Sequence, residues 1–246
     1  TGSTDKTLDT INLLQKENPK KIYFKEVGGV DPNHFTSIRQ QMLKETNSDW
    51  LIILDGDEVW WEERIKQVVE IINQKGNELD TIANRYINLI GDIYHYQSNS
   101  AGQYKIDGKK GFLTIRAMNR RIEGLNINRP HGQQGFFDKN NVLIQELNPK
   151  KRYFVDGFTN LHFTNLPRSN EKGDAGVPKR KMKHKYELGN LLPSDFYYPE
   201  VFFRPHPSII DSPWTRRDLL YVLRAGIETP LKRLKRKFKF GQKSGY

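Results

Sequence analysis

The run DGDE at residues 55–58 has the residue types and spacing that most clearly predict chemistry. It follows WLIIL at residues 50–54, an apolar run typical of a strand buried on both faces of a sheet. Open α/β sheets bind their ligands at the carboxyl ends of such strands. Hard divalent cations prefer carboxylate oxygens and often keep substrate phosphates, so Asp55 and Asp57 predict a metal–diphosphate site. The alternative is an ordinary strand-end turn with solvated acids, because Asp-Gly is a common turn pair.

Two further features precede this run. The small and hydroxylated residues TGSTD at 1–5 open a predicted helix and could present backbone N–H groups to a phosphate or nucleotide, or form an ordinary helix cap. Arg39 lies on the next predicted helix, where it could reach a phosphate, pair with Asp55, or remain solvated.

The elements that must position these residues alternate between helical and strand periodicity, which predicts β/α units. Apolar residues at helical spacing predict helices that begin after residue 5 and cover 35–43, 65–72 and 214–226. Strands are predicted at 22–24, 50–54, 81–90, 112–117 and 153–163. Thr1 lies within a predicted strand-to-helix turn, so we expect a first strand to precede it.

Composition narrows the possible functions. The 246 residues include no cysteine, which excludes a disulfide scaffold, a Cys-ligated zinc site and a thiol nucleophile. No apolar run is long enough to span a bilayer, and no signal peptide opens the sequence. The net charge of +11 predicts an anionic partner such as a nucleotide, a nucleic acid or a membrane surface.

The order and spacing of these residues resemble family-2 glycosyltransferases of the GT-A fold. In that family a Gly-Ser-x-Asp turn follows the first strand, and an Arg lies sixteen residues before the first Asp of an Asp-x-Asp motif; here these are residues 2–5, Arg39 and residues 55–57. LDGDE at 54–58 is most similar to the bacterial branch that builds lipooligosaccharide cores and related surface glycans. The resemblance is closest over residues 1–75.

This resemblance implies an α/β fold, a Rossmann-like GT-A mixed sheet flanked by helices. It implies a glycosyltransferase domain at 1–200, with a nucleotide-sugar half at 1–79 and an acceptor half at 80–200. An aromatic, Pro-rich and basic extension with a helix is expected at 201–246.

The implied reaction is inverting transfer from a nucleotide diphosphate sugar to a hydroxyl of a cell-surface glycan or lipid-linked acceptor, assisted by Mn²⁺ or Mg²⁺. Asp57 would be the main metal ligand, His162 a third ligand, and Asp55 would contact the metal through water or the ribose. The other implied donor-site residues are Gly2, Ser3, Asp5, Arg39 and Arg168. His131 and Trp60 are implied on the acceptor side, although Trp60 could instead pack against the helices.

Inversion needs a carboxylate to accept the proton of the attacking hydroxyl. Glu58 and Asp156 are equally ranked candidates, ahead of Asp138 and Glu146. The related branch often has His-Glu where this sequence has His131-Gly132, which leaves the identity of the base open.

Lys and Arg concentrate at residues 179–185 and 232–240, and apolar residues interleave the second cluster. Such segments dock on anionic membranes, which would suit a lipid-linked acceptor; the alternative is a solvated tail. We therefore expect a cytoplasmic protein, peripheral at the inner face of the plasma membrane. No nucleic-acid-binding motif is present, so no nucleic acid is expected. The alternative functions are a catalytically silent nucleotide- or glycan-binding module and a basic nucleic-acid-binding protein.

Overall fold

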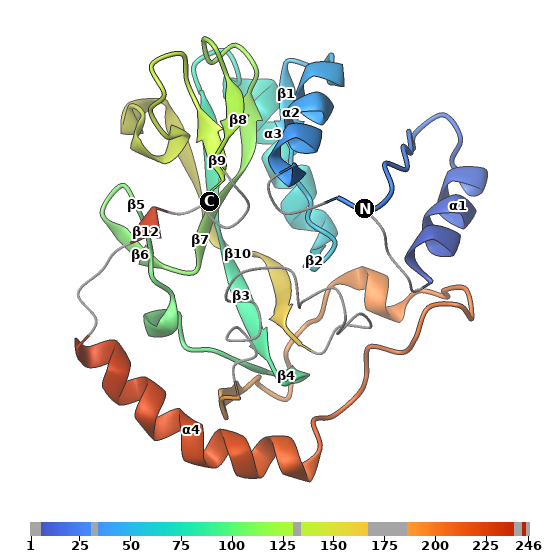
Figure 1. The fold of residues 1–246 in the computed structure, drawn as a ribbon, viewed down its shortest axis with the longest axis vertical. Helices are drawn as coiled ribbons and strands as arrows, with labels where there is room; N and C mark the ends of the chain where they lie inside the picture. Colours follow the sequence, from blue (N-terminus) through green and yellow to red (C-terminus); the bar gives the residue numbers. More distant parts are fainter. Residues whose placement is uncertain (1–5, 31–33, 130–133, 167–185, 239–242, 245–246) are drawn as a thin grey trace.

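The computed structural model describes residues 6–30, 34–129, 134–166, 186–238 and 243–244 (Figure 1). Strands and helices form a mixed α/β fold around one central sheet, as predicted. In Figure 1, α2 and the β8–β9 hairpin lie at one end of the molecule, and α4 lies along the other.

The helices are α1 (Thr7–Glu17), α2 (Phe35–Glu45), α3 (Glu62–Lys75) and α4 (Leu219–Phe238), with short 3₁₀ turns at Asn99–Ala101, Ile144–Glu146, Pro149–Lys151 and Glu200–Phe203. The strands of the central sheet are β1 (Trp50–Ile52), β2 (Glu58–Trp60), β3 (Thr81–Ile90), β4 (Asp92–Tyr96), β7 (Leu113–Asn119), β10 (Arg152–Asn165) and β11 (Asn190–Leu191). The remaining strands are β5 (Tyr104–Ile106), β6 (Lys109–Gly111), β8 (Asn126–Asn128), β9 (Gly135–Phe137) and β12 (Lys243–Ser244). The strand predicted at 22–24 is absent from the described chain, where residues 22–30 are irregular.

The central sheet has the order β1-β7-β3-β10-β2, and β4 and β11 extend it. β10 runs parallel to β3, and the other pairs are antiparallel. Both predicted halves of the domain therefore contribute strands to one sheet. The register places His162 of β10 between Glu58 of β2 and Asn88 of β3.

The core lies on both faces of β3 and β7. Ala83 packs with Leu43 of α2 on one face, and Ile82 packs with Val68 and Ile71 of α3 on the other. Neighbouring residues of β3 serve opposite faces because side chains alternate along a strand. The helices α2 and α3 thus cover the sheet from both sides.

The prediction that residues 50–54 form a strand buried on both faces is wrong. Ile52 is 40% exposed and Leu54 is 63% exposed. Among the described strands β1 pairs only with β7, so it is an edge strand with one side unpaired by the described sheet. The strands with near-continuous burial are β3 and β7 instead.

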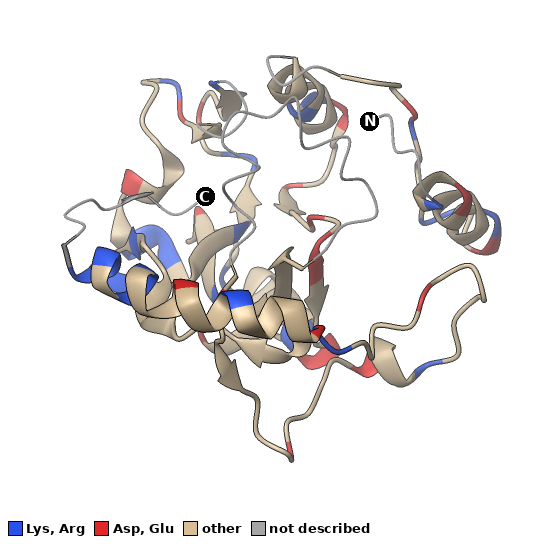
Figure 2. Cartoon of the chain, turned by 60° about the horizontal axis from the view of Figure 1, so that its bottom comes forward, with Lys and Arg blue, Asp and Glu red and all other residues tan. Residues whose placement is uncertain are grey.

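The C-terminal helix is longer than its sequence predicts. It begins at Leu219, passes through Pro230 and ends at Phe238, so much of the basic tail is helical. Its buried face contains Ala225 and Thr229, and the Thr229 hydroxyl accepts a hydrogen bond of 3.0 Å from the Leu188 amide. Figure 2 shows the Lys and Arg residues gathered toward the C-terminal part of this helix.

Candidate active site

The acids at 55–58 occupy the turn between β1 and β2. The Glu58 amide donates to the Asp55 carbonyl at 3.0 Å and closes the turn. The Phe163 amide donates to the Asp57 carbonyl at 2.8 Å and ties the turn to β10. Two backbone hydrogen bonds therefore fix the backbone positions from which the Asp55 and Asp57 side chains project.

Two arginines hold the Asp55 carboxylate. Arg39 of α2 donates to Oδ1 at 2.6 Å, and the Arg116 guanidinium of β7 lies 3.0 Å from Oδ2. The structure therefore contains the Arg39–Asp55 pairing, one of the three alternatives open for Arg39. Because both carboxylate oxygens are engaged, Asp55 is oriented toward the arginines.

Arg116 also binds Glu58, through a 3.1 Å hydrogen bond from Nε to Oε1 and a second contact from Nη2. Both side chains are almost completely buried. Burial alone lowers the pKa of Arg116, but the carboxylates of Glu58 and Asp55 outweigh it and raise that pKa above its ordinary value. Arg116 therefore stays charged and joins the two acids.

His162 faces the same turn from β10. Its Nε2 lies 3.6 Å from Oδ1 of Asp57, and its Nδ1 lies 3.1 Å from Oδ1 of Asn88. The rings of His162 and Tyr86 pack edge to face, with centroids 5.0 Å apart and planes at 81°. Burial raises the pKa of Tyr86 far above its ordinary range, so its hydroxyl stays neutral.

A divalent cation fits this pair of side chains. Asp57 supplies a carboxylate and His162 an imidazole, and both types are ligands of Mn²⁺. The 3.6 Å between Oδ1 and Nε2 is longer than a good hydrogen bond but suits two ligands of one cation. The described residues contain no group of three or more His, Asp or Glu arranged to hold a metal, so substrate oxygens and water would supply the other ligands.

The structure does not bring two predicted site residues to this cluster. Trp60 is buried in the core with Val68, so its ring packs inside rather than on an acceptor surface. Asp156 lies exposed on β10. Its register against β3 puts it about four residues of that strand before the level of His162, which is roughly 13 Å. Five other predicted residues lie outside the described part of the chain: Gly2, Ser3, Asp5, His131 and Arg168.

The other two candidate bases also lack the expected setting. Asp138 accepts hydrogen bonds of 2.9 Å from the backbone amides of Asn140 and Val142, an arrangement typical of a turn. Glu146 is exposed at the end of a 3₁₀ turn. Of the four carboxylates considered from sequence, only Glu58 lies in the cluster.

Sequence reasoning missed Arg116 and Asn88. The sequence carried a clear signal only for Arg116, a charged residue among the mainly apolar residues of its strand, whereas Asn88 is one of several polar residues in TIANRYINLI at 81–90. Charged and amide side chains at fully buried positions need hydrogen-bonding or ionic partners. An Arg within LTIRAM at 113–118 therefore predicts a buried acid nearby, and that acid is Glu58.

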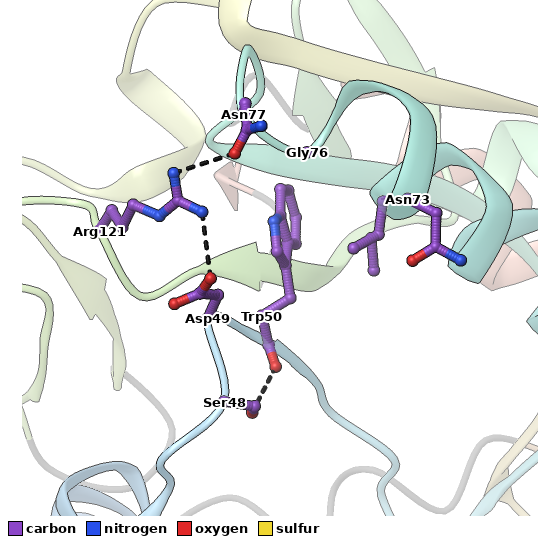
Figure 3. Close-up of a pocket in the computed structure, with 8 residues that line it drawn as sticks. Ser48, Asp49, Trp50, Asn73, Gly76, Asn77 and Arg121 are labelled. Atoms are coloured by element: carbon purple, nitrogen blue, oxygen red, sulfur yellow. Dashed lines mark hydrogen bonds and ion pairs between the residues drawn. The ribbon is translucent and has the colours of Figure 1, made fainter.

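A hollow of about 350 Å³ lies at the amino end of β1 (Figure 3), and Asp55 is not among its lining residues. Arg121 spans it, with hydrogen bonds of 3.1 Å to Asn77 and to Asp49, and Trp50 forms one wall. None of the predicted site residues lines this hollow. The site with the predicted chemistry is therefore the turn at 55–58.

A family model described as Glycosyl transferase family 2 matches residues 1–141. The matched region contains α2, β1 and β7, and with them Arg39, Asp55, Asp57 and Arg116. His162 and α4 lie beyond it. No curated protein matches the sequence significantly.

Proposed function

The chain belongs to glycosyl transferase family 2, and from that premise we propose inverting transfer of a sugar from a nucleotide diphosphate sugar to an acceptor hydroxyl. A glycosyltransferase of this family uses a nucleotide-sugar donor and an acceptor. The observation that carries the proposal is the convergence of Asp57 and His162 beside the ion-paired Asp55.

In this proposal Asp57 and His162 hold a divalent cation, Mn²⁺ or Mg²⁺. When bound, the cation would neutralise negative charge on the leaving diphosphate. Asp55 lies beside these ligands and is held by Arg39 and Arg116, which orients its carboxylate for the ribose or for a metal-bound water. Preorganised charges of this kind lower the reorganisation that the reaction requires.

Glu58 is better suited to positioning than to accepting a proton. Its side chain is inaccessible to an acceptor hydroxyl, and Oε1 is bonded to Arg116. By holding Arg116, Glu58 fixes the guanidinium that binds Asp55. We therefore assign Glu58 to the support of the donor site.

The first test is thermal unfolding with UDP, GDP, dTDP or CMP, each with and without Mn²⁺. A ligand at about 100 times its Kd adds about 2.7 kcal/mol to the free energy of unfolding. At this chain length that raises Tm by roughly 5–10 °C. We expect one nucleotide to produce a Mn²⁺-dependent shift, and Asp57→Asn to remove it.

The matched control is Asp49→Asn, which changes an exposed aspartate away from the site. It should keep the shift and should release nucleotide diphosphate from the sugar donor at the wild-type rate. The absence of a shift with every nucleotide, or full turnover by Asp57→Asn, contradicts the proposal.

For the acceptor we propose a cell-surface glycan or lipid-linked glycan, reached from an anionic membrane at the inner face of the plasma membrane. None of the described helices combines the length and apolarity that crossing a bilayer requires. The support for surface docking is α4, where apolar side chains recur at three- and four-residue spacing on the face opposite Ala225 and Thr229. They are between 54% and 76% exposed: Leu220, Leu223, Ile227, Leu231 and Leu234.

The charges on α4 favour an anionic lipid surface as the partner of this apolar stripe. The helix carries six Lys or Arg and one Glu. On a helical projection Arg224 and Lys235 flank the stripe on one side and Arg233 and Lys237 on the other. Pairing with a second copy would bring these like charges together, whereas lipid headgroups would neutralise them.

Docking is tested by co-sedimentation with phosphatidylcholine vesicles, with and without phosphatidylglycerol. We expect binding that requires the anionic lipid and weakens with salt. Leu223→Gln/Ile227→Gln should weaken it about tenfold or more, whereas Leu191→Gln, a leucine 67% exposed on β11, should not. Failure of the wild-type protein to bind, or a dimer abolished by the double variant without vesicle binding, would overturn docking.

A further inference from the structure

A line of hydrogen bonds runs from His162 to α4 through three buried side chains. Asn88 lies 3.1 Å from His162 and donates to Gln97 at 2.6 Å. Gln97 donates to Glu187 at 2.6 Å. Glu187 in turn accepts hydrogen bonds of 2.7 and 2.6 Å from Arg236 of α4. The three intermediate residues are 2–4% exposed, so the line is shielded from water.

The contact between Glu187 and Arg236 determines which group donates and which accepts in every hydrogen bond of the line. An ionised carboxylate only accepts, and Arg236 holds Glu187 in that form through a bidentate contact. Gln97 must therefore turn its amide nitrogen toward Glu187 and its oxygen toward Asn88. A second amide, from Asn165 at 3.4 Å, points at the same Gln97 oxygen.

The same logic continues to the imidazole. Because the Asn88 nitrogen is used toward Gln97, the Asn88 oxygen faces His162 and accepts from it. Nδ1 of His162 therefore carries a proton directed at Asn88, and Nε2 faces Asp57. If donors and acceptors exchanged roles along the line, Nδ1 would accept from Asn88. Nε2 would then carry the proton and could not bind a cation.

We propose that Asn88, Gln97 and Glu187 are positioning residues that hold His162 in the Nδ1–H tautomer, with Nε2 directed at the cation site. The inference rests on the proposed function for its cation, although the tautomer itself does not depend on metal. Hydrogen bonds to the distal nitrogen of metal-binding histidines fix ring orientation and tautomer in this way. Tyr86, whose ring packs nearly perpendicular to the imidazole, restricts its rotation.

The first readout is the ¹⁵N spectrum of the histidine side chains without metal, recorded as a pH series that reaches the neutral imidazole form. His162→Gln assigns the signal among the six histidines. Wild-type His162 should show a protonated Nδ1. Glu187→Gln keeps the shape but adds a donor that allows the line to reverse, so the Nε2–H form should appear.

The second readout is binding of Mn²⁺ alone to the full-length chain. Asn88→Ala should weaken Mn²⁺ binding about 10- to 100-fold, and Glu187→Gln should weaken it less. Asn88→Asp, whose carboxylate still accepts from Nδ1–H, should restore the wild-type tautomer. Glu228→Gln is the matched control, since Glu228 pairs with Arg224 and Lys232 on α4 and does not contact the line.

Two results would overturn the inference: an Nε2–H tautomer in the wild-type protein, or an unchanged tautomer in both Asn88→Ala and Glu187→Gln. If wild-type protein shows the expected tautomer but binds neither Mn²⁺ nor a nucleotide, the proposed function fails while the positioning inference stands. The spectrum and the binding measurement therefore separate the two failures.

Discussion

The turn at 55–58 and the outer face of α4 differ in which side chains they bury and which they expose to water. At the turn, Arg116 and Glu58 are charged groups buried together, and Arg39 and Asp55 complete a set of two cations and two anions. On the outer face of α4, leucines and an isoleucine are exposed beside basic side chains. The turn buries charged groups, whereas the outer face of α4 exposes apolar groups to water.

This difference indicates which interactions each region needs. A buried charge is tolerated only where its partners surround it, so the geometry of the turn is fixed from within the fold. Exposed apolar side chains gain nothing from folding, so their energetic value arises only when another surface covers them. The turn is therefore organised before a ligand arrives, whereas α4 depends on a partner.

The largest effect should come from removing the cation that joins the two acids. Arg116→Met should lower the free energy of unfolding by about 3–5 kcal/mol, because Glu58 is left buried without its guanidinium. Urea denaturation measures this loss. Arg120→Met, which removes a half-buried arginine just past the end of the same strand and its 3.3 Å hydrogen bond to the Ser48 carbonyl, should change stability by about 1 kcal/mol or less.

A double-mutant cycle sharpens this test. Adding Glu58→Gln to Arg116→Met should recover part of the stability, since the remaining amide carries no charge. Equal stability of wild type and Arg116→Met would mean that the buried pair does not organise the turn.

The sequence predicted the elements around the turn well where the apolar pattern determines structure. β3 was predicted at its observed bounds, and the helices α1, α2 and α3 were predicted from their apolar spacing. The Arg39–Asp55 contact was one of three open alternatives, because spacing along the chain sets reach but not rotamer. Arg116 within an apolar strand indicates a buried acidic partner, but only tertiary structure shows that the partner is Glu58.

Prediction was weaker where neighbours override local pattern. Residues 50–54 look like an interior strand, yet β1 has only one described partner and its end is exposed. Asp156 lies in a β-like segment, as predicted, but its distance from His162 depends on position along β10. A helix is predicted at 214–226, yet α4 extends from Leu219 to Phe238, and Thr229 and Arg236, beyond the predicted end, contact Leu188 and Glu187.

A smaller and pH-dependent effect is expected at the inner face of α4. Burial raises the pKa of Glu187, but the hydrogen bonds and charge of Arg236 outweigh it and hold that pKa below the ordinary 4.5. A lowered carboxyl pKa stabilises the fold above 4.5, and the contribution is lost as the pH falls through the folded-state pKa. Arg236→Gln should therefore lower stability by about 1.5–3 kcal/mol at neutral pH.

The difference between wild type and Arg236→Gln should shrink as the pH falls below 4.5. Denaturation series across that range check the trend, with Lys237→Gln as an exposed neighbour that leaves Glu187 paired. A difference that stays constant with pH would show that Arg236 acts through packing rather than through the charge of Glu187.

The smallest effect on folding should come from the outer face of the same helix. Leu223→Gln/Ile227→Gln replaces side chains that are 59% and 72% exposed, so stability without vesicles should change by less than about 0.5 kcal/mol. Ala225→Gln, two residues away on the buried face, should cost more, because its added side chain has no space and would leave a buried amide unpaired. Urea denaturation of the three proteins compares the faces directly. A loss of more than about 2 kcal/mol in the outer-face variant would mean that its leucines pack within the chain, and the contrast between self-contained turn and partner-dependent helix would not hold.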